Sequence, residues 1–243
     1  MRAIRLKTEH LIKPIGIDFH NPRLFWNCDG GRKQTAYQVI AEDDSGCVLW
    51  DSGKVESSSM RAEWEGNPLM PKTKVLWKVR LWDEDDNAGN WAETTFETGI
   101  EVWKAKWITG NYRVNKKQRY PVDCFYKAFS VSGIKKARLY ITACGLYEAK
   151  LNEQKVGDFV RTPGITDYRK RVQYQTYDVT DLLKNGENTL TVQLADGWYR
   201  GSTGAWGIRN QYGTETKLLA QLEITRTDGS VMTIISDESW GWS

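Results

Sequence analysis

Short runs of alternating apolar and polar residues, separated by turn signals, recur along almost the whole of this chain. In the clearest run, residues 77–82, the odd positions are apolar and Lys78 and Arg80 lie between them. A period of two predicts strands with one buried face. No segment shows the 3.6-residue apolar period of a long amphipathic helix, which argues against doubly wound and α/β-barrel folds. The sequence therefore predicts an all-β protein.

The strand pattern divides the chain into two parts. Its 243 residues suit one large domain or two ordinary ones. Several short strands over the first hundred residues predict an antiparallel sandwich that ends near Phe96–Gly99. A second set of strands begins near Trp103. We therefore predict two domains, residues 1–100 and 101–243, with Trp26, Trp77 and Trp91 in the core of the first.

Composition excludes several classes of function. The net charge is only +3 and the basic residues are dispersed, which argues against a nucleic-acid surface. No apolar run approaches the roughly 18–20 residues of a membrane span. The first ten residues lack the apolar stretch of a secretory signal, which predicts a cytoplasmic location. Two histidines and no C-x-x-C spacing argue against zinc clusters and His-dependent triads.

The richest segment, Ala195–Arg209, follows a predicted strand and contains four glycines. Its aromatic residues are Trp198, Tyr199 and Trp206, and its charged residues are Asp196, Arg200 and Arg209. Sugars are bound by aromatic faces with polar groups beside them, so this segment is a candidate carbohydrate-binding loop. Alternatively, Trp198 and Tyr199 close the end of a sandwich, and Asp196 ties the loop to backbone N–H groups. The sequence alone shows no assembled catalytic site.

Two ordered series of short motifs carry a family resemblance. In the first domain they are Pro14–Asp18, Pro22–Trp26, Gln34–Val39, Leu49–Val55 and Trp77–Asp83. In the second they are Ala105–Ile108, Ala137–Tyr140, Leu151–Asn152, Val156–Asp158, Pro163–Tyr168, Tyr174–Thr180 and Asp196–Gly201. Each motif is weak alone, but the ordered series is specific. By these motifs the chain resembles the N-terminal portion of bacterial α-L-rhamnosidases, the glycoside hydrolases that remove terminal rhamnose.

The resemblance implies a fold for this chain and a separate catalytic domain. It implies a fibronectin-III-like sandwich followed by a jelly-roll sandwich of the galactose-binding-like kind. The family's catalytic unit is an α-helical barrel further downstream, and nothing in this chain resembles it. The chain is therefore expected to be an accessory, non-catalytic segment with no catalytic residues of its own. Its expected partners are a rhamnose-containing glycoside and its own downstream barrel.

The resemblance also implies further site residues. In some relatives the second module binds rhamnose with calcium, which adds Asp167 and Tyr168 to the sugar candidates and makes Asn152 and Asp158 candidate Ca²⁺ ligands. Asn and Asp beside Gly and Pro more often cap turns, and that alternative stays open. The chain departs from the family at Ile165, where a Trp is usual, so a stacking face is expected to be poorer there.

Three functions remain open. The chain is an accessory pair of modules that contacts carbohydrate, a purely structural support for the missing barrel, or a free-standing adhesion module. The structural role predicts an exposed apolar patch on the isolated chain.

Overall fold

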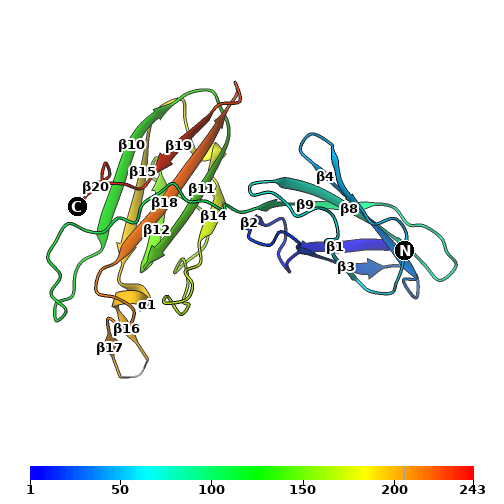
Figure 1. Ribbon diagram of the computed structural model, residues 1–243, viewed down its shortest axis with the longest axis horizontal. Helices are drawn as coiled ribbons and strands as arrows, with labels where there is room; N and C mark the ends of the chain where they lie inside the picture. Colours follow the sequence, from blue (N-terminus) through cyan, green and yellow to red (C-terminus); the bar gives the residue numbers. More distant parts are fainter. Residues whose placement is uncertain (205) are drawn as a thin grey trace. The chain divides into compact units, whose positions relative to one another are not determined.

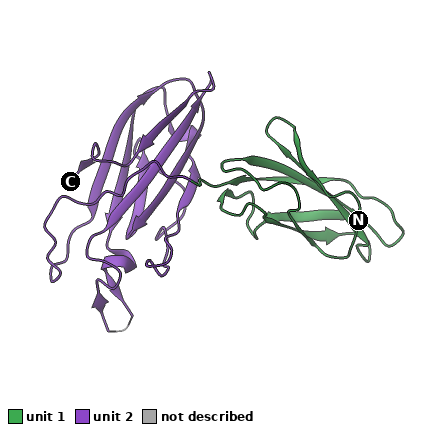
Figure 2. Ribbon diagram, viewed as in Figure 1, with its two compact units in different colours: residues 1–101 green, residues 102–243 purple. Residues whose placement is uncertain are grey.

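The computed structural model describes residues 1–204 and 206–243, and its regular structure is almost entirely β (Figure 1). Its internal contacts divide the chain into unit 1, Met1–Glu101, and unit 2, Val102–Ser243 (Figure 2). The all-β prediction is confirmed. Among the described residues, no helix is long and apolar enough to cross a membrane.

Unit 1 contains two sheets. The three-stranded sheet has the order β1-β3-β7, formed by β1 (Arg2–Thr8), β3 (Arg23–Asp29) and β7 (Arg61–Glu63). The larger sheet has the order β2-β9-β8-β4-β5, formed by β2 (Ile15–Ile17), β9 (Ala92–Thr98), β8 (Lys74–Trp82), β4 (Ala36–Asp43) and β5 (Val48–Asp51). A short strand, β6 (Val55–Glu56), also pairs with β4. Only the β2–β9 pair is parallel among the pairs described in unit 1.

The alternation in β8 builds the core of unit 1. Trp77, Val79 and Leu81 are fully buried, as the period of two predicted. The indole of Trp77 also donates a 3.1 Å hydrogen bond from Nε1 to Oγ1 of the buried Thr8. Trp26 is buried as well, and its Nε1 donates to Oε1 of Gln34. The indole N–H groups are thereby satisfied inside an apolar core.

The prediction that Trp91 belongs to the core is wrong. Trp91 is 38% exposed. Its ring lies 4.8 Å from Cζ of Arg80 and 5.8 Å from Nζ of Lys78, two polar side chains of β8. Trp91 therefore covers the solvent-facing side of β8 through cation–π contacts, because the inner side is already filled by its own alternating residues.

Unit 2 is a sandwich of two main sheets. One has the order β13-β12-β15-β10-β20, formed by β13 (Gln154–Lys155), β12 (Leu146–Leu151), β15 (Gly186–Ala195), β10 (Asp123–Val131) and β20 (Gly241–Trp242). The other has the order β14-β11-β18-β19, formed by β14 (Gln175–Asp178), β11 (Ile134–Cys144), β18 (Lys217–Arg226) and β19 (Val231–Ile235). Its core is apolar and includes Ile141, Val192 and Leu222.

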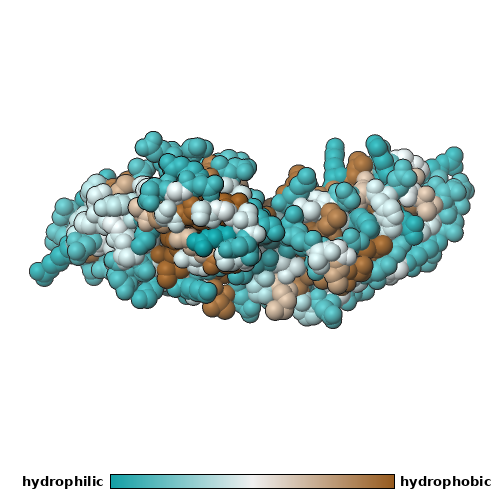
Figure 3. Space-filling model, turned by 90° about the horizontal axis from the view of Figure 1, so that it is seen from above, coloured by the Kyte–Doolittle hydropathy of each residue, from teal (hydrophilic) through white to brown (hydrophobic). Residues whose placement is uncertain are grey.

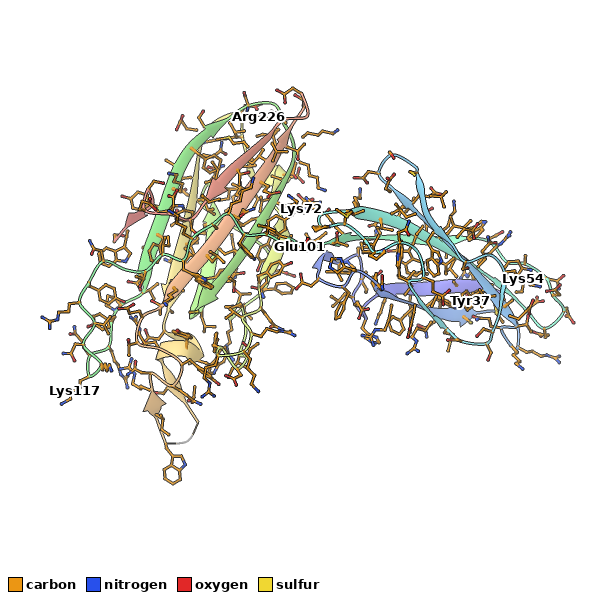
Figure 4. All side chains as sticks on the ribbon, in the orientation of Figure 1. Tyr37, Lys54, Lys72, Glu101, Lys117 and Arg226 are labelled. Carbon is orange, nitrogen blue, oxygen red and sulfur yellow. The ribbon has the colours of Figure 1, made fainter. Side chains whose placement is uncertain are left out.

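A single helical turn, α1 (Gly197–Arg200), and a hairpin of β16 (Ser202–Thr203) and β17 (Ile208–Arg209) lie at one end of unit 2 (Figure 1). A 3₁₀ turn, η1 (Thr180–Leu182), lies beside the start of β11, where the hydroxyl of Thr180 accepts a hydrogen bond from the backbone N–H of Ala137. Lys117, on the loop before β10, lies at the same end as α1, β16 and β17 (Figures 1 and 4). Arg226, on the β18–β19 hairpin, lies at the opposite end (Figure 4). The candidate loop and the segment before β10 are therefore neighbours.

Candidate functional site

The candidate loop begins with a tight turn after β15. Gly197 has a φ of +52°, and a Cβ there would lie 2.7 Å from Cγ of Leu146 and 3.0 Å from the backbone of Gly145. A side chain is excluded by both the left-handed backbone and the close approach of β12. The turn is followed directly by α1, which carries Trp198, Tyr199 and Arg200.

The charged residues of the loop are bonded to one another. Oδ1 of Asp196 accepts a 2.7 Å bond from Nε of Arg200, and Oδ2 accepts a 2.8 Å bond from Nη2 of Arg209. Arg200 is 2% exposed. Asp196 therefore holds α1 and β17 together through two guanidinium groups. The sequence had suggested other partners for Asp196, either a sugar hydroxyl or backbone N–H groups.

Arg200 also connects the loop to the segment before β10. Its Nη1 donates a 2.5 Å bond to the hydroxyl of Tyr112, and its Cζ lies 5.1 Å from the ring centre of Tyr120. The two tyrosine rings are stacked with centroids 4.6 Å apart. The bonds to Tyr112 and Asp196 raise the pKa of Arg200 although burial acts against them, so the guanidinium stays charged. Burial raises the pKa of Tyr112.

Sequence reasoning missed this aromatic partner of the loop. Tyr112 and Tyr120 lie about eighty residues before Arg200, and no local pattern links them. The hydroxyl of Tyr112 also donates a 3.3 Å bond to Oδ2 of Asp123, which is 3% exposed. The burial of Asp123, which requires polar partners, is visible only in the structure, so the sequence offered no signal for this contact.

A second aromatic cluster includes Tyr199 of the loop. The ring of Tyr168 lies 5.3 Å from that of Tyr199 and 5.0 Å from that of Tyr212, centroid to centroid. Cζ of Arg169 lies 5.4 Å from the Tyr212 ring, and the hydroxyl of Tyr168 donates to the carbonyl of Gly164. The sequence nominated Tyr168 and Tyr199 separately. The structure brings them together as a packed pair.

Two tryptophans of the loop differ in exposure. Trp198 is half-buried, whereas Trp206 is 90% exposed. Trp206 therefore offers an open indole face. Ile165, the position at which the resemblance implies a Trp, is 58% exposed.

Asp167 caps a turn. Its Oδ1 accepts bonds from the backbone N–H and from Nε of Arg169, at 3.3 and 3.0 Å. These bonds hold the pKa of the Asp167 carboxyl below its usual value, chiefly through the side chain of Arg169. In the structure, Asp167 therefore caps a turn, as the structural alternative for this residue expected.

The two candidate calcium ligands lie in different settings. The amide nitrogen of Asn152 donates to the carbonyl of Leu182 and to Oδ1 of Asn188, at 2.9 and 2.7 Å. Its Oδ1 accepts from the backbone N–H of Thr189. Asp158 is exposed. Calcium binding by these residues stays a prediction, and the bonds of Asn152 give it a structural task.

The structural task of Asn152 can be measured. Asn152→Ala should lower the free energy of unfolding by about 1–3 kcal/mol, because three hydrogen bonds are lost. Residue 152 has a φ of +51°, a conformation that glycine adopts without strain. Asn152→Gly therefore removes the side-chain hydrogen bonds without the backbone strain that alanine would add, and it separates the two contributions to the lost stability. Urea denaturation should give the same loss with Ca²⁺ or with a chelator. A loss seen only in Ca²⁺ would show that Asn152 is a ligand instead.

The tyrosine cluster predicts a loss of stability at high pH. Burial raises the pKa of Tyr168 to about 12, from an ordinary value of 10.0. The folded state therefore favours the neutral phenol of Tyr168. The neutral phenol contributes fully to the free energy of unfolding below pH 10, and this contribution is lost as the pH rises towards 12. Urea midpoints measured over this range should fall, and should fall less steeply in Tyr168→Phe. An equal slope in the two proteins would rule out this origin.

The two units match two known families of domains. Residues 3–101 match the Rha78A-like, N-terminal immunoglobulin domain, and residues 132–243 match the α-L-rhamnosidase N-terminal domain. An α-L-rhamnosidase of Formosa agariphila is 39% identical over 96% of this chain and 27% of its own length. One from Streptomyces avermitilis is 28% identical over 99% of the chain and 41% of its own length. The chain thus spans about a quarter to two-fifths of these curated relatives.

Solved structures show the same relationship. The native α-L-rhamnosidase of Aspergillus terreus is 35% identical with a TM-score of 0.92, and the match covers all of this chain and 29% of that protein. The α-L-rhamnosidase of Dictyoglomus thermophilum is 37% identical with a TM-score of 0.88, covering all of this chain and 30% of that protein. The resemblance seen in the motifs is confirmed. The chain belongs to the α-L-rhamnosidase family as its N-terminal part, an immunoglobulin-like domain followed by the α-L-rhamnosidase N-terminal domain.

Proposed function

We propose that this chain is the accessory part of an enzyme that hydrolyses terminal α-L-rhamnose from glycosides. The observation that carries the proposal is that the chain has the two domain matches, residues 3–101 and 132–243, and is similar over 96–99% of its length to relatives named α-L-rhamnosidase. Those relatives are much longer than this chain, so the hydrolytic chemistry is assigned to the part of the protein outside it.

The substrate class is tested on the full-length gene product. It should release nitrophenol from 4-nitrophenyl α-L-rhamnopyranoside and leave the corresponding α-D-glucopyranoside and β-D-galactopyranoside intact. Hydrolysis of another glycoside in place of the rhamnoside would overturn the proposed substrate.

Carbohydrate contact by the candidate loop is the narrower part of the proposal. Trp206 supports it, because its indole is 90% exposed and open to stacking against a sugar ring. Asp196, Arg200 and Arg209 act behind it as the clamp that holds the loop. We expect Trp206 to contribute a stacking contact to the bound sugar.

A structural role is the second candidate, and an exposed apolar patch favours it. Val122, Phe159 and Val160 are 50–75% exposed and line one groove beside β12. Apolar patches also interrupt the largely hydrophilic surface seen in Figure 3. A patch of this kind marks a contact surface, here for the remainder of the longer protein. Amide hydrogen exchange around residues 156–162 should be slower in the full-length protein than in this chain if the patch is covered.

A further inference from the structure

Unit 2 has a pocket that is lined by none of the candidate site residues inferred from the sequence. It encloses about 470 Å³ between the segment before β10 and the C-terminal strand β20. Ligand sites for small molecules commonly enclose about 300–1,000 Å³. Its apolar lining consists of Trp107, Ile108, Phe125, Trp240 and Trp242. The pocket therefore has three indoles within a volume suited to a sugar ring.

Trp242 is held as a fixed platform. Its Nε1 donates a 3.1 Å bond to Oδ1 of the buried Asp123, and its ring lies 5.7 Å from that of Tyr112. Its strand pairs with β10, where Trp242 lies opposite Phe125. The neighbouring Gly241 is covered by the ring of Tyr126, since a Cβ there would lie 2.1 Å from Cζ. The orientation of the indole is thus set before any ligand arrives.

The other two indoles differ in role. Trp240 is 9% exposed, and its Nε1 donates a 2.7 Å bond to the carbonyl of Ile235, so it forms the floor with Phe125. Trp107 is 44% exposed and stands at the edge of the pocket. A ligand ring entering the pocket would meet two partly exposed indoles, those of Trp107 and Trp242, and an apolar floor.

The rim of the pocket carries both hydrogen-bond donors and acceptors. Nζ of Lys106 lies 3.4 Å from Oε2 of Glu238, and Asp237 and Asn111 stand beside them. The pKa of Glu238 is lowered by its own backbone N–H and by Lys106, and that of Asp237 by the hydroxyl of Ser239. Both groups are therefore carboxylates at neutral pH and accept bonds from hydroxyl groups.

We infer that this pocket binds a neutral pyranose ring, stacked on Trp107 and Trp242 with its hydroxyls bonded to the Lys106–Glu238 rim. An anionic ligand would meet two carboxylates, and a cation would meet Lys106. A sugar hydroxyl donates and accepts, and so suits a rim that does both. The stacked C–H face suits the indoles. The choice of L-rhamnose as the first probe rests on the proposed function.

The test is a titration of the 243-residue chain with L-rhamnose, followed by NMR of the indole N–H signals. The signals of Trp107 and Trp242 should shift and saturate. Trp107→Ala should weaken binding at least about tenfold, because one stacking face is lost. Glu238→Gln, at a largely exposed carboxylate, should weaken binding without affecting the fold. Trp91→Ala, at a partly exposed indole of unit 1, is the matched control and should bind as the parent chain does.

Each outcome decides between sites. If Trp206→Ala loses binding and Trp107→Ala keeps it, the sugar binds at the loop and the pocket inference is wrong. If L-rhamnose, D-glucose and D-galactose all fail to shift Trp107 and Trp242, the pocket is not a sugar site. If D-galactose binds there and L-rhamnose does not, the pocket inference stands and the proposed rhamnoside function is weakened.

Discussion

Replacing Asp196 by alanine should lower the free energy of unfolding of unit 2 by about 3–5 kcal/mol. Arg200 is 2% exposed, and Asp196 is the carboxylate that its Nε contacts at 2.7 Å. Among the described residues, removing Asp196 leaves the buried guanidinium with the neutral hydroxyl of Tyr112 as its remaining hydrogen-bond partner. The Nη2 atom of Arg200 already has no hydrogen-bond partner among the described residues. Urea denaturation with hydrogen exchange of β11 and β15 amides measures the loss in unit 2.

Two variants show whether the buried charge is the cause. The double variant Asp196→Ala with Arg200→Met should recover much of the lost stability, because a well-packed apolar side chain replaces the unpaired charge. Asp167→Ala, at a carboxylate whose arginine partner is largely exposed, should leave the unfolding midpoint nearly unchanged. If the double variant is as unstable as the single one, the clamp does not act through charge.

Replacing Trp77 by alanine should cost unit 1 about 3–5 kcal/mol. Trp77 is completely buried, and its loss leaves a large cavity in the core and removes the donor to the buried Thr8. Because a domain of this size is stabilised by only about 5–15 kcal/mol, the variant should unfold at much lower urea concentration. Urea denaturation followed by hydrogen exchange of β4 and β8 amides isolates unit 1.

Trp91→Ala is the matched control, in a residue of the same type beside the same strand. Trp91 is partly exposed and contacts Arg80 and Lys78, so its loss should cost about 1 kcal/mol or less. Equal losses for Trp77→Ala and Trp91→Ala would contradict the burial pattern described for β8.

The fold of both units was predictable because it depends on local periodicity. The alternation in residues 77–82 determines which side chains of β8 face the core, and the buried Trp77, Val79 and Leu81 follow that pattern. Trp91 could not be assigned in this way. It lies just before β9, outside an alternating run, so only the position of Arg80 and Lys78 in space shows where its ring is held.

Of the candidate site, only the contacts between residues close in the sequence were predictable. The sequence identified the loop after β15, where Asp196 and Arg200 are four residues apart and meet across one turn of α1. The stacked Tyr112 and Tyr120, and the platform Trp242, come from segments remote in the chain. Asp123 joins these segments through bonds from Tyr112 and Trp242, and no spacing in the sequence expresses that contact.

The most direct test of the account compares two proteins on one substrate. The full-length gene product and the 243-residue chain are assayed at equal molar concentration with 4-nitrophenyl α-L-rhamnopyranoside. The account predicts that the full-length protein releases nitrophenol and that the folded chain, checked by circular dichroism, releases none. Turnover by the chain alone, abolished by heat denaturation, would contradict its assignment as the accessory part of the enzyme.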